Sequence, residues 1–174
     1  MNEELTYIGI DNGISGALAF YKPAKQMLVT MPMPIIKAKS GKGFKSEYDI
    51  PQILSIIRNF SFIRMAILEK AQSFPGQGVS SMFTIGKNFG IMLGILTALQ
   101  LPHQIIHPRR WQKRMFEDIP HKDTKAASIL VASRLFPSHD FRATEKSKVL
   151  HHGCSDAALM AYYSYLSHEK DQIK

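Results

Sequence analysis

The stretch GIDNGISGAL, residues 9–18, ends one apolar run on an acid and begins another after a short turn. The run that it completes, residues 5–11, is rich in apolar and β-branched side chains, which is typical of a buried strand. The apolar run over 16–21 is expected to pair with it as the second strand of a hairpin. Because burying a lone carboxylate is costly, a buried strand that ends on Asp11 needs a compensating partner or a functional reason.

Three interpretations fit the Asp-x-Gly-x-Ser-Gly pattern of residues 11–16. It resembles the phosphate loop of sugar-kinase and actin-like ATPases, in which an acid handles the metal of a nucleotide and glycines let backbone N–H groups approach phosphate. It also resembles the first hairpin of ribonuclease H-like nucleases, in which the acid binds Mg²⁺ directly. The third interpretation is an ordinary turn at Asn12 and Gly13. The actin-like ATPases have two duplicated halves, and 174 residues leave no room for both.

Length and composition indicate one domain over residues 1–174. Hydrophobic residues make up 45% of the chain, enough for a sizeable core, and no unbroken apolar run approaches the roughly 18 residues of a membrane span. Lys and Arg outnumber Asp and Glu by 22 to 14, giving a net charge of +8 and a pI near 9.6, which favours nucleic acid over a membrane as partner. One cysteine excludes an internal disulfide. Together with an N-terminus unlike a signal peptide, it favours the cytoplasm of a bacterial or phage-infected cell.

The order of apolar patterns predicts an α/β fold, in which three strands are followed by alternating helices and strands of a mixed sheet. Asp49 and Thr124 are expected to cap two of the helices, and the lysine-rich segment 37–47 is expected to be a loop. Glycines recur at every fourth position of the helix over 81–100, where they suit either a dimer contact or packing against the sheet. Further strands are predicted at 26–33, 62–69 and 103–108, and helices at 48–60, 81–100, 109–116, 125–135 and 152–167.

A second and a third acid occupy positions comparable to that of Asp11. Glu69 ends another apolar run, and Asp156 lies near the start of an apolar helix, four residues after His152. Acids that end neighbouring buried strands lie close together and need a cation, for which hard oxygen ligands select Mg²⁺ or Mn²⁺. Exposed positions for Glu69 and for the start of the helix explain the same pattern without a metal.

The chain resembles the RuvC-like Holliday junction resolvases, especially their phage and organellar members. The resemblance covers about residues 5–167 and implies a ribonuclease H-like fold, with a five-stranded mixed sheet flanked by helices. It also implies a homodimer that cuts four-way DNA junctions with divalent metal and leaves 5′-phosphate and 3′-hydroxyl ends. The stretches that carry it, in this order, are YIGIDNGISGALAFY (7–21), AILEKAQSFPGQGVSSMFTIGKNFG (66–90), IIHPRRWQKRMF (105–116) and HHGCSDAALMAYY (151–163).

Carried over position by position, the resemblance makes Asp11, Glu69 and Asp156 the metal-binding carboxylates. Bacterial members have Asp or His three residues before the last acid, where this chain has Gly153. Relatives with an Asp-Gly pair place the ligand one residue earlier, which favours His152 over the histidine before it. These four side chains are expected to hold two ions of Mg²⁺ or Mn²⁺, and an imidazole among them shifts the preference toward Mn²⁺.

Basic residues around the third stretch are the expected DNA contacts. Lys113 and Lys125 match family lysines near the scissile phosphate and complete the expected catalytic set. Phe74 matches an aromatic that wedges into the opened junction and stacks on a base. A solvated helix face, with Trp111 in the core, and an aromatic that packs within its own loop are the alternatives. The expected DNA-binding residues are Phe74, Arg109, Arg110, Lys113, Lys122 and Lys125.

The sequence therefore favours a Holliday junction resolvase that serves DNA recombination and repair. One alternative is another ribonuclease H-like nuclease, acting on RNA or on RNA–DNA hybrids. A second is a catalytically silent basic module that binds nucleic acid, and a third is a half-size nucleotide-binding domain. Loss of cleavage with retained junction binding in Asp11→Asn would exclude the silent module.

Overall fold

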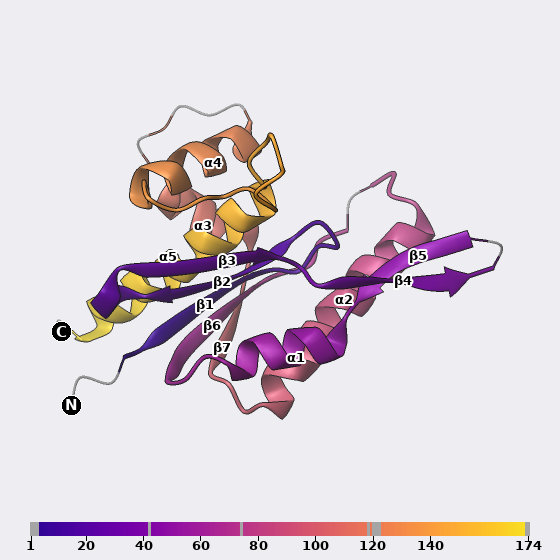
Figure 1. Ribbon diagram of the computed structural model, residues 1–174, viewed down its shortest axis with the longest axis horizontal. Helices are drawn as coiled ribbons and strands as arrows, with labels where there is room; N and C mark the ends of the chain where they lie inside the picture. Colours follow the sequence, from indigo (N-terminus) through magenta and orange to yellow (C-terminus); the bar gives the residue numbers. More distant parts are fainter. Residues whose placement is uncertain (1–3, 42, 74, 118, 120–122, 173–174) are drawn as a thin grey trace.

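A five-stranded mixed sheet with helices on both faces forms the body of the protein, as a computed structural model shows (Figure 1). The structure describes residues 4–41, 43–73, 75–117, 119 and 123–172. Three helices from the C-terminal half cover one face of the sheet, and two earlier helices cover the other (Figure 1).

The strands of this sheet are β1 (Thr6–Asp11), β2 (Ala17–Lys22), β3 (Met27–Pro32), β6 (Ile63–Glu69) and β7 (His103–Ile106). Their order is β3-β2-β1-β6-β7, which confirms the expected mixed sheet. β1, β2 and β3 pair antiparallel, whereas β1, β6 and β7 run parallel. A short 3₁₀ turn, η1 (Pro23–Lys25), links β2 to β3.

The helices are α1 (Ile50–Arg58), α2 (Val79–Ala98), α3 (Pro108–Met115), α4 (Thr124–Leu135) and α5 (His152–Gln172). Asp49 caps α1 as expected, because its carboxylate accepts a hydrogen bond from the backbone N–H of Gln52 at 3.0 Å. The cap expected for α4, Thr124, is wrong by one residue. Asp123 caps that helix, since its Oδ1 accepts from the backbone N–H of Lys125 at 2.9 Å and so reaches the free donors of the first turn.

Side chains of the sheet alternate between two hydrophobic cores, one on each face. Ile8 and Ile10 of β1 belong to the core beneath α1 and α2. On the other face Ala19 belongs to the core beneath α3, α4 and α5. A Cβ at Gly9 would overlap the backbone carbonyl of Ala157, so only glycine at this position lets α5 lie directly against β1.

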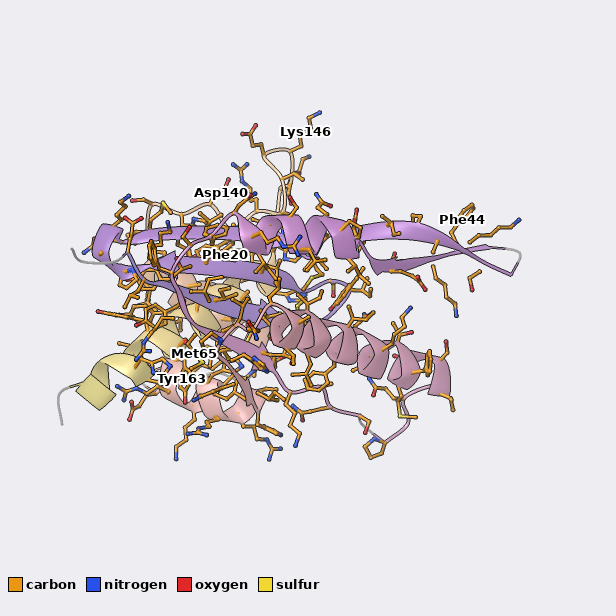
Figure 2. The ribbon with its side chains drawn as sticks, turned by 90° about the horizontal axis from the view of Figure 1, so that it is seen from below. Phe20, Phe44, Met65, Asp140, Lys146 and Tyr163 are labelled. Atoms are coloured by element: carbon orange, nitrogen blue, oxygen red, sulfur yellow. The ribbon has the colours of Figure 1, made fainter. Side chains whose placement is uncertain are left out.

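The lysine-rich segment that was expected to be a loop is a two-stranded sheet. β4 (Ile35–Ser40) and β5 (Gly43–Tyr48) pair antiparallel and extend past the end of the main sheet (Figure 1). Phe44 lies near the far end of this hairpin (Figure 2). Lysines and glycines hide the strand pattern in the sequence. The two strands form nonetheless, because pairing at six cross-strand positions provides hydrogen-bond partners for their backbone N–H and C=O groups.

α2 presents a row of glycines away from the sheet. A Cβ at Gly86, Gly90 or Gly94 would meet nothing within 4 Å, so these glycines do not pack against the sheet. The opposite face of the helix supplies the buried residues, which include Met92. By length and composition alone α2 is apolar enough to cross a membrane, with a mean hydropathy of 1.3 over a window of which 22% is buried. An apolar helix at a protein interface has the same composition, so this property is weak evidence for a membrane.

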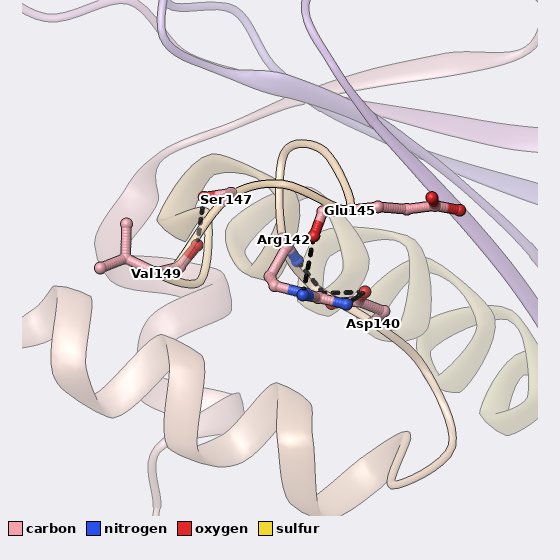
Figure 3. A network of polar contacts seen from close by, with 5 residues as sticks. All are labelled: Asp140, Arg142, Glu145, Ser147 and Val149. Carbon is pink, nitrogen blue, oxygen red and sulfur yellow. Dashed lines mark hydrogen bonds and ion pairs between the residues drawn. The ribbon is translucent and has the colours of Figure 1, made fainter.

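The connection from α4 to α5 is fixed by its own polar contacts (Figure 3). The guanidinium of Arg142 donates to both carboxylate oxygens of Asp140, at 2.6 to 3.0 Å, and to the backbone carbonyl of Glu145 at 3.0 Å. At the end of the connection, the backbone N–H of His151 donates to the carbonyl of Phe141 at 2.8 Å. These contacts define where α5 begins.

Candidate active site

Asp11 and Glu69 end two neighbouring parallel strands, β1 and β6. The register pairs Ile10 with Leu68, so the acids that follow leave the same edge of the sheet next to each other. Both strands are otherwise buried along their last residues, which brings the two carboxyl groups to the boundary of the core. The carboxyl ends of parallel strands are where open α/β sheets bind their ligands.

α5 brings Asp156 to the same edge. A Cβ at Gly153 would lie 2.7 Å from the carbonyl oxygen of Ser15, so the first turn of α5 rests on the turn between β1 and β2. Asp156 follows in the second turn of α5 and is half-buried. Its charge acts on Glu69, and the charge of Asp11 acts on it, so the three carboxyl groups lie near one another.

Burial raises the pKa of all three carboxyl groups. Desolvation raises the pKa of Asp11. The backbone N–H of Gly13 donates to its Oδ1 at 3.3 Å, which lowers the pKa and partly offsets this effect. Burial and the charge of Asp11 raise the pKa of Glu69 to about 7. Burial and the charge of Asp11 also raise the pKa of Asp156 to about 7, opposed by the Ser128 hydroxyl. Raised carboxyl pKa values mean that the ionised forms are unfavourable here, and a bound cation would stabilise them.

Hydrogen bonds from two side chains position Glu69. The indole Nε1 of Trp111 donates to its Oε1 at 2.9 Å, and the amide Nδ2 of Asn12 donates to its backbone carbonyl at 2.7 Å. The hydroxyl of Tyr48 donates in turn to the backbone carbonyl of Asn12. Trp111 is fully buried, which confirms its expected place in the core and adds a polar role that the sequence did not indicate.

The two histidines at the start of α5 have different surroundings, although their rings stack with centroids 5.8 Å apart. Nδ1 of His151 accepts from the backbone N–H of Cys154 at 3.2 Å. Burial and the neighbouring imidazole lower the pKa of His151, and the charge of Asp11 opposes them. Burial, followed by the charge of Lys125, lowers the pKa of His152. His151 is therefore the ring coupled to Asp11, and a ligand role for His152 stays a prediction.

Among the expected basic residues that the structure describes, Lys125 is the one whose charge acts on the carboxylate site. It is exposed in the first turn of α4, and its charge acts on both His152 and Asp156. Lys113 is exposed on α3, two residues after Trp111, and no described contact joins it to the carboxyl groups.

The two arginines of α3 that were predicted to bind DNA, Arg109 and Arg110, line different grooves. Arg109 lines one groove together with Lys113, whereas Arg110 lines another beside Tyr163 of α5. Tyr163 is seven residues beyond Asp156, about 10 Å farther along the helix. Arg110 is therefore turned away from the end of α5 that carries the acid.

Two predicted residues, Phe74 and Lys122, lie outside the described residues. Within the described part of the chain, no group of three or more His, Cys, Asp or Glu side chains is close enough to hold a metal ion. The charges of the three carboxyl groups therefore act on one another, but the groups are not close enough together in this structure to coordinate one ion. Their hard oxygen atoms and their shared excess of negative charge still fit a divalent cation.

Asn12 and Tyr48 support the site but were not predicted from the sequence. The only available signal for Asn12 is its place directly after Asp11, where it also fits an ordinary turn. Tyr48 gives no signal, because the contact between its hydroxyl and Asn12 joins residues that are 36 positions apart.

The chain has a ribonuclease H-like fold, and solved structures of Holliday junction resolvases are among those similar to it. Thermus thermophilus RuvC is similar with a TM-score of 0.56 and 14% identity over 95% of this chain and 96% of that chain. T. thermophilus RuvC in complex with Holliday junction substrate gives the same values. The yeast mitochondrial Holliday junction resolvase Ydc2 is similar with a TM-score of 0.57 and 12% identity over 97% of this chain and 82% of that chain. No protein-family model matches the sequence, and no curated protein is significantly similar to it.

These likenesses confirm the fold class and agree with the resemblance to RuvC-like resolvases. They include a bacterial and a mitochondrial protein, so they do not select the phage or organellar subtype. At 12–14% identity they establish the fold, and the activity has to be argued from the site.

Proposed function

We propose that this protein is a metal-dependent endonuclease that resolves four-way DNA junctions. The observation that carries the proposal is the parallel register that brings Asp11 and Glu69 side by side at one edge of the sheet, with the charge of Asp156 acting on Glu69. Burial, together with the charge of Asp11, raises the pKa of Glu69 and of Asp156, and none of the three acids takes part in a described ion pair. Divalent cations would relieve this repulsion.

The proposed site holds two ions of Mg²⁺ or Mn²⁺. Asp11, Glu69 and Asp156 would bind them together with one imidazole, for which His152 is our prediction and His151 the alternative. Because the described side chains do not form a closed set, binding would draw them together. When bound, such ions supply an activated water and relieve the charge on the phosphate during in-line attack.

The residues of the chain itself prepare this chemistry. Trp111 and Asn12 hold Glu69 in place, and the backbone N–H of Gly13 holds the carboxylate of Asp11. The ammonium group of Lys125 would bind an oxygen of the scissile phosphate, a role supported by the effect of its charge on His152 and Asp156. Lys113, on α3, would contact a phosphate of the DNA farther from the carboxylate site. Hydrolysis is proposed to leave 5′-phosphate and 3′-hydroxyl ends.

Branched DNA is the substrate that charge and fold support together. The net charge of +8 favours a polyanion, and a T. thermophilus RuvC with the same fold was solved in complex with Holliday junction substrate. Arg109 and Lys113 form one basic surface of α3 that would contact phosphates. We place this activity in the cytoplasm of a bacterial or phage-infected cell, where the buried Cys154 stays reduced.

A homodimer would present two sites to two strands of the junction. On α2, Val79 is 79% exposed and Phe83 is 72% exposed, and both lie on the same face as Gly86, Gly90 and Gly94. An exposed apolar stripe whose small residues allow close approach suits a contact between two copies of one helix. We propose that this face of α2 packs against its equivalent around a twofold axis.

Cleavage of a four-way junction in Mg²⁺ or Mn²⁺ tests the function, next to a linear duplex and an RNA–DNA hybrid of matched sequence. We expect paired, symmetric cuts in the junction by the wild-type protein, and binding without cuts by Asp11→Asn. Preferential cutting of the hybrid would replace the proposal with a ribonuclease activity. Junction binding without any cutting by the wild-type protein would indicate a silent binding module.

A further inference from the structure

A pocket of about 440 Å³ lies beside the carboxylate site. The turn after β1, the β4–β5 hairpin and the first turns of α2 form its walls. Its size falls within the roughly 300–1,000 Å³ of ordinary ligand sites. The polar residues that line it include Asn12, Lys45, Ser80, Ser81, Thr84 and Asn88.

The outer part of this pocket suits an anion. The ammonium group of Lys45 and the hydroxyls of Ser80 and Ser81 supply donors, and none of its described lining residues is acidic. The N-terminus of α2 also faces it. Gly78 caps that helix without a side-chain hydrogen bond, and the first turn contains no acidic residue, which leaves the partial positive charge of the helix end uncompensated.

The inner part of the pocket contains a buried amide without a complete set of partners. Asn88 is 2% exposed and lines the pocket, and its Oδ1 has no hydrogen-bond partner among the described residues. A buried carbonyl oxygen without a donor is unfavourable, so this oxygen indicates a missing donor group. A base edge supplies donor and acceptor together, which is what a carboxamide can pair with.

The walls of the pocket are tied to the carboxylate site. Tyr48, the last residue of the hairpin, donates to the carbonyl of Asn12, whose amide donates to the carbonyl of Glu69 at 2.7 Å. Lys87 of α2 pairs with Glu47 of β5 at 2.8 Å, which joins the helix to the hairpin. A ligand in the pocket would therefore lie directly beside the proposed metal site.

We propose that this pocket binds one unstacked nucleotide of the DNA strand that reaches the carboxylates. Its phosphate would lie at Lys45, Ser80 and Ser81, and its base edge at Asn88. From there the strand would continue along the hairpin, where Lys39 and the 73% exposed Phe44 are cross-strand neighbours (Figure 2). The inference rests on the proposed function, because it assumes that DNA is the ligand of the adjacent site.

Binding of the Lys45→Ala variant tests the phosphate position. In an Asp11→Asn background, which prevents cleavage, its affinity for a four-way junction and for single-stranded DNA is measured across a salt series. We expect affinity to fall several-fold and the salt slope to decrease by about 0.7–0.9, the effect of losing one phosphate contact. Lys25→Ala is the control, because it removes the same charge from η1, where Lys25 pairs with Glu4 at 2.6 Å. Equal affinity and slope for Lys45→Ala and the control would overturn the proposal.

Asn88→Leu tests the base position. Cleavage is measured on junctions in which each base next to the cut is varied in turn. We expect a preference of up to about tenfold at one position in the wild-type protein, and its loss in the variant. Thermal unfolding is recorded in parallel, and the midpoint is expected to stay constant or rise, because leucine removes an oxygen without a partner. A variant that cuts with the wild-type preference would overturn the base contact.

These outcomes separate the pocket from the proposed function. If the wild-type protein neither prefers nor cuts four-way junctions, the proposed function fails, while the comparison of Lys45→Ala with Lys25→Ala on single-stranded DNA still decides whether the pocket binds a strand. If junctions are cut normally and Lys45→Ala matches its control, the pocket fails alone.

Discussion

Trp111 and Glu69 are joined by a hydrogen bond of 2.9 Å from the indole Nε1 to the carboxylate Oε1. The indole is fully buried, so the core of the protein directly orients one acid of the proposed metal site. The same bond lowers the pKa of Glu69, against the larger effect of burial. A buried aromatic of the core thereby also favours the ionised form of a proposed metal ligand.

Trp111→Phe is expected to slow junction cleavage by about 10–100-fold, the usual effect of removing a hydrogen bond from a metal ligand. The acidic limb of the pH–rate profile should move to higher pH, because the ionised form of Glu69 loses a donor. Phe116→Leu is the control, since this neighbour in the same core packs against the indole at 5.7 Å between ring centroids. If both variants lower the rate equally without a change in profile, the bond serves packing alone.

The metal-free protein is expected to lose stability as pH rises from about 4 to about 8. The pKa values of Glu69 and Asp156 are about 7 in the folded protein, above their ordinary values of 4.5 and 3.8. Between these limits the two groups bind more protons in the folded state than in the unfolded state, so their contribution to the free energy of unfolding decreases as pH rises.

Chemical denaturation at a series of pH values measures this effect. Added Mn²⁺ should stabilise the protein strongly at pH 8 and weakly at pH 5, where the carboxyl groups hold protons. Asp11→Asn should show a smaller loss of stability with pH, because it removes the charge that acts on the other two acids. A stability that rises from pH 5 to pH 8 without metal would contradict this account of the site.

Two glycine substitutions should have opposite effects on stability. Gly9→Ala places a methyl group against the backbone of α5 and is expected to cost about 1–3 kcal/mol or more. Gly90→Ala adds a methyl group that meets no atom within 4 Å in the single chain, so in the monomeric Phe83→Asp background it should add up to about 1 kcal/mol through helix propensity. Denaturant titration of both variants measures the difference, and a Gly9→Ala protein as stable as the wild type would show that α5 is not held against β1.

Phe83→Asp is expected to convert a dimer into a monomer of 19.6 kDa, because it places a charge in the proposed apolar contact of α2. Light scattering coupled to size-exclusion chromatography gives the mass. Val149→Asp is the matched control, since Val149 is also 72% exposed but lies in the connection before α5. A wild-type protein that is monomeric at micromolar concentration would refute this contact.

The sequence predicted most of the fold because its main signals are local. The strands that end on Asp11 and Glu69 are short apolar runs bounded by turns, and their parallel pairing follows from the ordinary rules of α/β connection. The cap at Asp49 follows a local pattern as well. The hairpin of β4 and β5 was missed because its stability comes from cross-strand pairs, which alternation of residue type does not reveal here.

The contacts that tune the site could not be read from the sequence. The bonds from Trp111 to Glu69 and from Tyr48 to Asn12 join residues 42 and 36 positions apart. Adjacent histidines present the same difficulty, since only their three-dimensional surroundings show that His151 is coupled to Asp11. Sequence spacing predicts which acids form the site, whereas packing decides their hydrogen-bond partners.

The most direct test of the central claim is an anomalous diffraction measurement on crystals of the protein soaked in Mn²⁺. We predict two peaks at the edge of the sheet, with Asp11, Glu69 and Asp156 as ligands and one imidazole completing the set. Absence of any peak within bonding distance of these three carboxylates, at a Mn²⁺ concentration that supports cleavage, would contradict the account.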